Sequence, residues 1–238
     1  MPSVVLPKQP FKNRVLISLS PPDIGRLSEH LLPVTLKSKD SLHEPGELIN
    51  TVYFLEDAVA SVVITMENGG TVEVGLIGRD GVVGLPAVLG NGRATNRTFI
   101  QLPGSGFSVK AKILRELAES SSEFRSHLQL AIQGYLIQTA QTAACNRVHE
   151  LEERLARWLL MCSDRLQSDH IPITHEFLAM MLGTRRSSVS IAAGILHKSG
   201  LITYSRGSVT IQNRDQLAHA ACECYQSVLD EYVRLGLL

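Results

Sequence analysis

The stretch ITHEFLAMMLGTRRSSVSIAAGILHKSG, residues 173–200, most constrains the fold, because its spacing fits two short helices joined by a tight turn. Thr174 is a good N-cap and Glu176 suits the first helical turn through the helix dipole. Ala179 is small enough for two helices to approach closely, Gly183 permits the turn, and Val189 packs the second helix onto the first. This spacing predicts a helix-turn-helix, which lays its second helix in the major groove of DNA.

The residues that follow predict a wing beside this second helix. We expect the helix to run from near Arg185 to Gly200, a natural C-cap residue. LITYSRGSVTI, residues 201–211, then reads as two strands around a Ser-Arg-Gly-Ser turn. Residues 174–211 hold four basic residues and one acidic residue, whereas the whole chain has 23 of each and no net charge. The argument for a nucleic-acid partner is therefore local.

Two adjacent arginines, Arg185 and Arg186, begin the second helix, where positive charge opposes the helix dipole. Phosphate groups or guanine edges would compensate them. A solvated helix start is the alternative, and for Ser188 ordinary surface is equally plausible. The predicted DNA-contacting residues are Thr174, His175, Thr184, Arg185, Arg186, Ser187, Ser188, Ser190 and, on the wing, Arg206.

Residues 36–110 read as short strands separated by turns. VASVVITM and TVEVGLI flank Asn68-Gly69-Gly70, a strong hairpin signal, and TFIQL and GFSVK flank Pro103-Gly104-Ser105-Gly106. Before them, Pro21-Pro22 fits the start of a short helix. Many short strands with regular turns predict an antiparallel β-roll of the cupin-like jelly-roll kind, so the fold class is α+β.

The 21 residues from Ser126 to Asn146 lack Asp, Glu, Lys and Arg within a predicted helical region, residues 111–166. A membrane span is excluded, because five glutamine and histidine side chains of this stretch would lie in the lipid. We expect a helix covered on two sides. Its 4-3-4 seam, which consists of Phe124, Leu128, Ala131 and Tyr135, suits a partner helix in a homodimer. A second stripe holds Ile132, Leu136, Ala140 and Ala143, and a purely internal core helix is the alternative.

The chain therefore divides into three predicted parts: a sensor domain at 1–120, a dimerisation helix at 121–147 and a winged helix-turn-helix domain at 148–238. The last residues, 213–238, read as one C-terminal helix, on which Cys222 and Cys224 would diverge and make a poor metal pair. The four cysteines are too scattered for a disulfide framework. Cys145 is interpreted as a small buried residue, with a redox sensor as the alternative.

A β-roll, a long uncharged helix and a winged helix-turn-helix, in that order, resemble the Crp/Fnr family of bacterial transcription regulators. The resemblance covers about residues 15–211, including HEPGELINTVYFLEDAVASVVI, LEERLARWLL and ITHEFLAMMLGTRRSSVS. It implies a homodimer that binds a palindromic operator in double-stranded DNA, with RNA polymerase as a further partner.

Departures from the family pattern concern the effector. Cyclic-AMP-binding members have a glutamate after the glycine that matches Gly84, but this chain has Leu85 there. Arg97 and Thr98 match the family's phosphate-binding pair only with a two-residue insertion, and Thr139 matches a helix hydroxyl that contacts the base. These five residues form the predicted effector pocket, for an effector that is unknown and not expected to be cyclic AMP.

Two further departures concern metal and DNA. Residues 1–144 contain no cysteine, which excludes the N-terminal iron–sulfur cluster of Fnr-type members. No cofactor and no metal site are predicted. In the recognition helix, Arg186 matches a base-reading arginine of the family, but Ser187 and Ile191 replace the next glutamate and second arginine. The operator is therefore expected to differ from a TGTGA-type half-site.

The predicted function is a homodimeric, sequence-specific DNA-binding transcription regulator. The alternative is a ligand-sensing protein that acts through protein contacts and uses the helix-turn-helix as a scaffold. No motif of a hydrolase, metalloprotease or phosphate loop occurs, so an enzyme is not expected. The N-terminal apolar patch is too short for a signal peptide or a membrane span, so a cytoplasmic location without membrane contact is expected.

Overall fold

The computed structural model describes residues 11–238, so most of the N-terminal apolar patch lies outside the described residues. The chain divides into two compact units. The first comprises the chain up to Ala60, residues 77–135 and residues 232–238, and the second comprises residues 61–76 and 136–231. No helix of the described part of the chain is both long and apolar enough to cross a membrane.

The first unit contains antiparallel strands, as predicted. Strand β7 (Gly104–Lys110) pairs with β1 (Leu32–Leu36) on one side and with β3 (Thr51–Leu55) on the other. Strand β2 (Ser41–His43) pairs with β6 (Arg97–Leu102). The strands β6 and β7 thus belong to different sheets, and the chain crosses between them at Pro103. Gly106 is required on β7, because a Cβ there would lie 2.6 Å from the Phe54 carbonyl oxygen.

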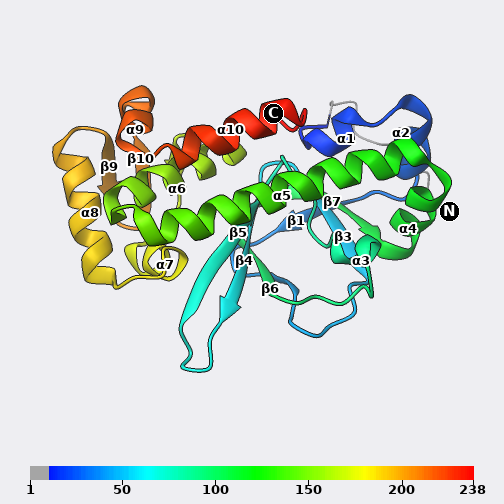
Figure 1. The fold of residues 1–238 in the computed structure, drawn as a ribbon, viewed down its shortest axis with the longest axis horizontal. Helices are drawn as coiled ribbons and strands as arrows, with labels where there is room; N and C mark the ends of the chain where they lie inside the picture. Colours follow the sequence, from blue (N-terminus) through cyan, green and yellow to red (C-terminus); the bar gives the residue numbers. More distant parts are fainter. Residues whose placement is uncertain (1–10) are drawn as a thin grey trace. The chain divides into compact units, whose positions relative to one another are not determined.

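Short helices accompany these strands (Figure 1). The predicted helix after Ser20 is present as α2 (Pro21–Ser28) and begins with two prolines. The others are α1 (Arg14–Ser18), α3 (Pro86–Leu89) and α4 (Ala111–Ser120). Large apolar side chains without exposed surface fill the core, among them Phe54, Ile100, Leu102 and Leu114.

The long helix α5 (Ser122–Val148) contains the charge-free stretch. Phe124, Leu128 and Ala131 are at most 2% exposed within a single chain. On the same helix, a Cβ on Gly134 would lie 2.5 Å from Leu237, so C-terminal residues cover this side. The prediction that this seam, with the half-buried Tyr135, meets a partner helix is therefore wrong, because the chain's own packing occupies it. The second stripe remains accessible, and Leu136 is 61% exposed.

The second unit contains most of the predicted hairpin of β4 (Val59–Thr65) and β5 (Thr71–Ile77), namely its residues 61–76. The Met66 amide donates to the Gly70 carbonyl at 2.8 Å across its turn. Helix α6 (Leu151–Leu166) follows α5 and starts with a capping box between Glu150 and Glu153. The remaining elements are β8 (His170–Ile171), α7 (His175–Met181), α8 (Arg186–Lys198), β9 (Ile202–Ser205), β10 (Ser208–Ile211), α9 (Arg214–Ala220) and α10 (Cys224–Arg234).

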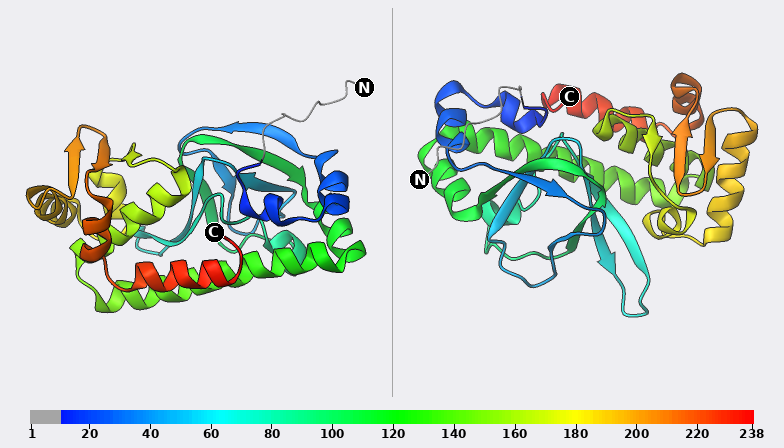
Figure 2. Two further views of the ribbon diagram at one scale, coloured as in Figure 1. Left: turned by 90° about the horizontal axis from the view of Figure 1, so that it is seen from above. Right: turned by 180° about the vertical axis from the view of Figure 1, so that it is seen from behind.

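The C-terminal segment is two helices, so the prediction of one helix over 213–238 is wrong. Ala221 adopts an extended conformation, with ψ 154°, and ends α9. Arg214, at the start of α9, donates to the Tyr225 hydroxyl at 2.9 Å and also pairs with Asp164 of α6. This contact draws the first turn of α10 back toward α9. In Figures 1 and 2, α10 runs beside α5.

Candidate DNA-binding site

Helix α7 begins as the sequence predicts. The hydroxyl oxygen of Thr174 accepts a hydrogen bond from the Phe177 amide at 3.2 Å, which satisfies one of the free donors at the helix start. Leu178 and Ala179 are buried on the inner face. Thr174 itself is exposed at the surface.

The turn between α7 and α8 depends on one glycine. Gly183 has a φ of +60°, a region that side chains with a Cβ rarely adopt. The Thr184 amide then donates to the Ala179 carbonyl at 2.9 Å and closes the turn. From α6, the Arg154 guanidinium donates to the Leu182 carbonyl, so a neighbouring helix also holds the turn in place.

Helix α8 presents an apolar inner face and an exposed outer face. Val189, Ala192 and Leu196 are at most 3% exposed, as predicted for the face that packs on the rest of the domain. On the outer face, Ile191 is 67% exposed and Ile195 is 44% exposed. The outer face thus combines polar side chains in the first turn with apolar side chains farther along the helix.

The first turn of α8 is suited to an anion. Arg185 occupies the N-cap position in an extended conformation and makes no side-chain cap. The Arg185 side chain therefore accepts no hydrogen bond from the amide groups at this end of the helix. Arg185, Arg186 and Ser187 are exposed around these amides, while Ser188 and Thr184 are half-buried. Free amides and arginines in this arrangement favour phosphate oxygens or base edges.

His175 occupies a more constrained position than the sequence indicates. Its ring stacks on Tyr204 of β9, and its Nδ1 lies 3.1 Å from the Ser190 hydroxyl oxygen on α8. Burial, and secondarily the charge of Arg186, lower the pKa of His175. Ser190 also donates to the Arg186 carbonyl at 3.0 Å, so its hydroxyl is engaged within the domain.

The predicted wing is present. Strand β10 pairs antiparallel with β9 and also with β8, which gives a three-stranded sheet. At the turn, the hydroxyl groups of Ser205 and Ser208 lie 2.7 Å apart, and Gly207 has a φ of +85°. Arg206 is exposed at this tip. Yellow α7 and α8 and the orange strands lie together in the right view of Figure 2.

The predicted effector residues are less clearly organised. In the first unit, Gly84 has a φ of +98° and is tightly enclosed, since a Cβ there would lie 3.2 Å from His43 and from Val52. Leu85 and Thr98 are buried. Arg97 is already engaged, because its Nε lies 3.1 Å from Glu44.

The fifth effector residue, Thr139, is half-buried on α5 and belongs to the second unit. A depression of about 580 Å³ in the first unit is lined by residues such as Phe11, Pro33, Glu56 and Phe107. None of the five predicted effector residues lines this depression. The effector pocket therefore stays a prediction.

Sequence reasoning missed two features of the second unit. The sequence indicates only that Tyr204 lies in a strand. No pattern in the sequence predicts that Tyr204 stacks on His175. The cluster of Cys145, His149, Cys222 and Cys224 was missed because the expected single C-terminal helix separates the last two cysteines.

Comparisons with known proteins agree with this geometry. Residues 153–220 match the family described as the Crp-like helix-turn-helix domain. The chain is 20% identical over 202 residues to the global nitrogen regulator of Synechocystis sp., an alignment that covers 79% of this chain and 89% of that protein.

Solved structures show the same fold. FixK2 from Bradyrhizobium japonicum has a TM-score of 0.69 at 17% identity, over 81% of this chain and 98% of that one. A putative transcriptional regulator of the Crp/Fnr family from Eubacterium rectale has a TM-score of 0.66 at 16% identity, over 87% of this chain and 96% of that one. The chain therefore contains a Crp-like helix-turn-helix domain at residues 153–220, and it shares its fold with FixK2 and with the Crp/Fnr-family regulator from Eubacterium rectale.

Proposed function

We propose that this regulator is a homodimer that reads a palindromic operator with the first turn of α8. The observation that carries the proposal is the exposed pair Arg185 and Arg186 at the uncapped start of α8. Arg186 contacts a guanine edge in the major groove, with the exposed Ser187 beside it. Arg206 on the wing and the residues at the start of α7 contact phosphates, which position the domain.

Ile191 is the second residue of α8 that we propose to contact a base. Its side chain is 67% exposed, one turn beyond Ser187 on the outer face of α8. An apolar side chain at this place cannot accept or donate a hydrogen bond, but it can contact the methyl group of thymine. We expect each half-site to contain a thymine next to the base pair that Arg186 reads.

Dimerisation is assigned to the second stripe of α5. Leu136 is 61% exposed, and Ala140 and Ala143 are exposed one and two turns farther along. Small residues beside a leucine allow a second copy of the helix to approach closely. A Leu136→Glu variant should therefore shift the protein toward monomer in sedimentation velocity, whereas Met66→Glu, at an equally exposed apolar residue in the β4–β5 turn, should not. RNA polymerase is the proposed partner of the DNA-bound dimer, and the effector is unassigned.

The experiment that tests the main proposal is the salt dependence of duplex binding. A regulator that neutralises phosphates loses affinity steeply as salt rises, since binding releases counterions. We expect such a slope for a duplex obtained by binding-site selection, with weaker binding to unrelated DNA. Exposed Ile191 and Ile195 also suit a protein partner, so an absence of duplex binding would favour the alternative in which the domain is a scaffold for protein contacts.

A further inference from the structure

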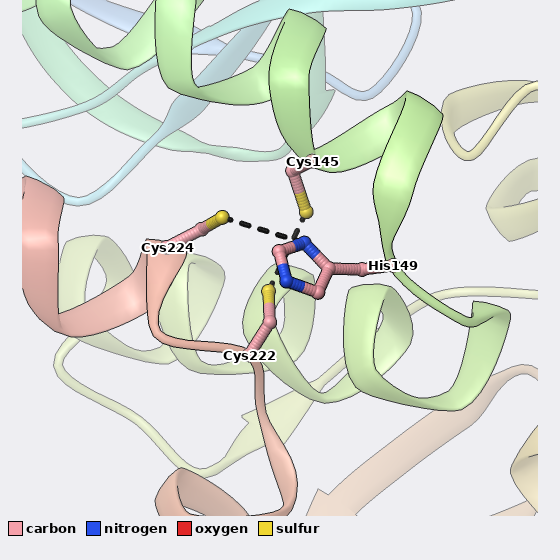
Figure 3. Close-up of side chains that lie close together, drawn as sticks. All are labelled: Cys145, His149, Cys222 and Cys224. Atoms are coloured by element: carbon pink, nitrogen blue, oxygen red, sulfur yellow. Dashed lines mark hydrogen bonds between the residues drawn. The ribbon is translucent and has the colours of Figure 1, made fainter.

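Three cysteines and one histidine of the second unit lie together, outside the DNA-binding site (Figure 3). They are Cys145 on α5, His149 just after it, Cys222 in the connection between α9 and α10, and Cys224 at the start of α10. Their sulfur and ring nitrogen atoms all lie within 4.8 Å of one another. The three cysteines are buried, and the His149 side chain is 15% exposed.

Two local features of the chain create this cluster. Cys145 and His149 are four residues apart, which places them on the same face at the end of α5. The extended backbone at Ala221 interrupts the C-terminal helix and lets Cys222 and Cys224 point the same way. On one continuous helix, residues two apart point to different sides. The break therefore converts an unsuitable spacing into a shared site.

The spacing of the ligand atoms fits one metal ion. The sulfurs of Cys145 and Cys222 are 3.5 Å apart, and the sulfur of Cys224 is 3.6 Å from His149 Nδ1. Around zinc, with zinc–sulfur bonds of about 2.3 Å, the corners of a tetrahedron are about 3.8 Å apart. Three sulfurs and one imidazole nitrogen are a common ligand set for structural zinc. In an iron–sulfur cluster, the ligands bind several iron atoms, which requires a wider arrangement than this one.

The surroundings of the cluster also fit a metal ligand set. His149 directs Nδ1 at the sulfurs while its Nε2 lies 3.1 Å from the Glu223 carboxylate. A carboxylate on the far nitrogen orients a ligating histidine and increases its basicity. The Gln141 side-chain amide donates to the Cys224 sulfur at 3.0 Å, a contact that stabilises a thiolate.

Positive charge near the sulfurs would offset the charge of three thiolates. The buried Arg157 and the half-buried Arg154, both on α6, interact electrostatically with Cys145. One divalent ion with three thiolates and a neutral imidazole has a net charge of about −1, which either arginine balances.

We propose that Cys145, His149, Cys222 and Cys224 form a tetrahedral site for a single thiophilic divalent cation of the zinc class. The thiols lose their protons to solvent as the ion binds. The ion would connect the end of α5 to the α9–α10 connection, segments 77 residues apart in the sequence. It would thereby hold the corner where the chain enters α6, the helix whose Arg154 contacts the turn of the helix-turn-helix.

The proposal is tested on the full-length protein, reduced, freed of metal and then given zinc(II) alone. We expect one zinc per chain by mass spectrometry of the metal after gel filtration, protection of three thiols from a thiol reagent, and cobalt(II) spectra typical of tetrahedral thiolate ligation. The variants Cys145→Ser and Cys224→Ser should each lose at least 100-fold in zinc affinity. Glu223→Gln, which keeps all four ligands, should lose about 10-fold, in line with the effect of outer-shell partners.

Cys162→Ser is the matched control, because Cys162 is equally buried but lies outside the cluster on α6. It should retain one zinc per chain with unchanged affinity. If a serine variant does not fold, His149→Gln and the thiol-protection measurement on the wild type still decide the question. Iron with acid-labile sulfide, a Cys145–Cys222 disulfide that forms regardless of zinc, or zinc binding that survives the ligand variants would each overturn the assignment.

Discussion

The ring of His175, the first residue of α7, stacks on the ring of Tyr204 in β9, with centroids 3.9 Å apart and planes inclined by 25°. The stack joins the first helix of the helix-turn-helix to the wing. His175 follows the exposed Thr174 in the chain, and Tyr204 precedes the exposed Arg206 of the wing by two residues. The relative position of helix and wing therefore depends on a contact that neither element makes alone.

Removal of either ring should weaken this connection. A double-mutant cycle with His175→Ala and Tyr204→Ala should give a coupling free energy of about 0.5–1.5 kcal/mol in urea unfolding. As a control, Tyr204→Ala should combine additively with His219→Ala, which alters an exposed histidine on α9. Additive effects in the first cycle would show that the stack contributes nothing to stability.

Arg186→Ala should change which operators the protein prefers. Loss of a bidentate contact to guanine is expected to cost about 1–3 kcal/mol and to relax selection at one base pair per half-site. Binding-site selection on wild type and variant measures this directly. Arg206→Ala should instead weaken binding to all sequences equally. It should also reduce the slope of log affinity against log salt concentration by about 1 per wing. An undiminished base preference after Arg186→Ala would contradict the assignment.

Replacement of thymine by uracil in the operator tests Ile191. Uracil lacks the methyl group, whose burial is worth roughly 0.8 kcal/mol, so wild-type affinity should fall about fourfold at the thymine that Ile191 contacts. The Ile191→Ala variant should bind both duplexes with nearly equal affinity. An equal loss in both proteins would mean that the methyl group contacts something other than Ile191.

Two glycines of the helix-turn-helix should respond to alanine in opposite ways. Gly183→Ala should destabilise the protein by about 1–2 kcal/mol, because φ is +60° there and the new Cβ would lie 3.0 Å from Val72. Gly194→Ala, inside α8 with nothing within 4 Å of the new Cβ, should stabilise it by about 0.8–1 kcal/mol. Thermal unfolding of the two variants compares these effects.

Glu73 should make stability depend on pH. Burial raises its pKa from 4.5 to about 7, although Ser61 and Trp158 donate hydrogen bonds to its carboxyl group and Arg165 and Arg157 are near. The folded state holds this proton more tightly than the unfolded chain. The stabilisation is therefore complete below about pH 4.5 and is lost as pH rises to about 7, at most about 3 kcal/mol at 1.36 kcal/mol per pH unit.

Glu73→Gln should remove this part of the pH dependence of the free energy of unfolding, measured in urea at pH 5 and pH 8. Glu67→Gln, at an exposed carboxylate in the β4–β5 turn, should leave it unchanged. If the free energy of unfolding of Glu73→Gln falls between pH 5 and pH 8 by as much as that of the wild type, the pKa of Glu73 is not raised in the folded protein.

The sequence by itself determined the elements that depend on local rules. The N-cap at Thr174, the turn at Gly183, the inner face with Val189 and the turn before Gly70 all follow from residue type and short-range spacing, and all are present. The order of these elements sufficed to indicate the resemblance to the Crp/Fnr family and the Crp-like helix-turn-helix domain, because each element forms from interactions within a few residues.

Only the tertiary structure decided which surfaces are already occupied. The seam of Phe124 and Leu128 has the spacing of a partner-binding helix, but the same spacing serves a helix packed inside its own chain, and burial alone separates the two. Likewise Cys222 and Cys224 diverge under helical periodicity and converge on Cys145 only because Ala221 breaks the helix. Periodicity describes a helix face, whereas the contacts made by that face depend on residues far away in the sequence.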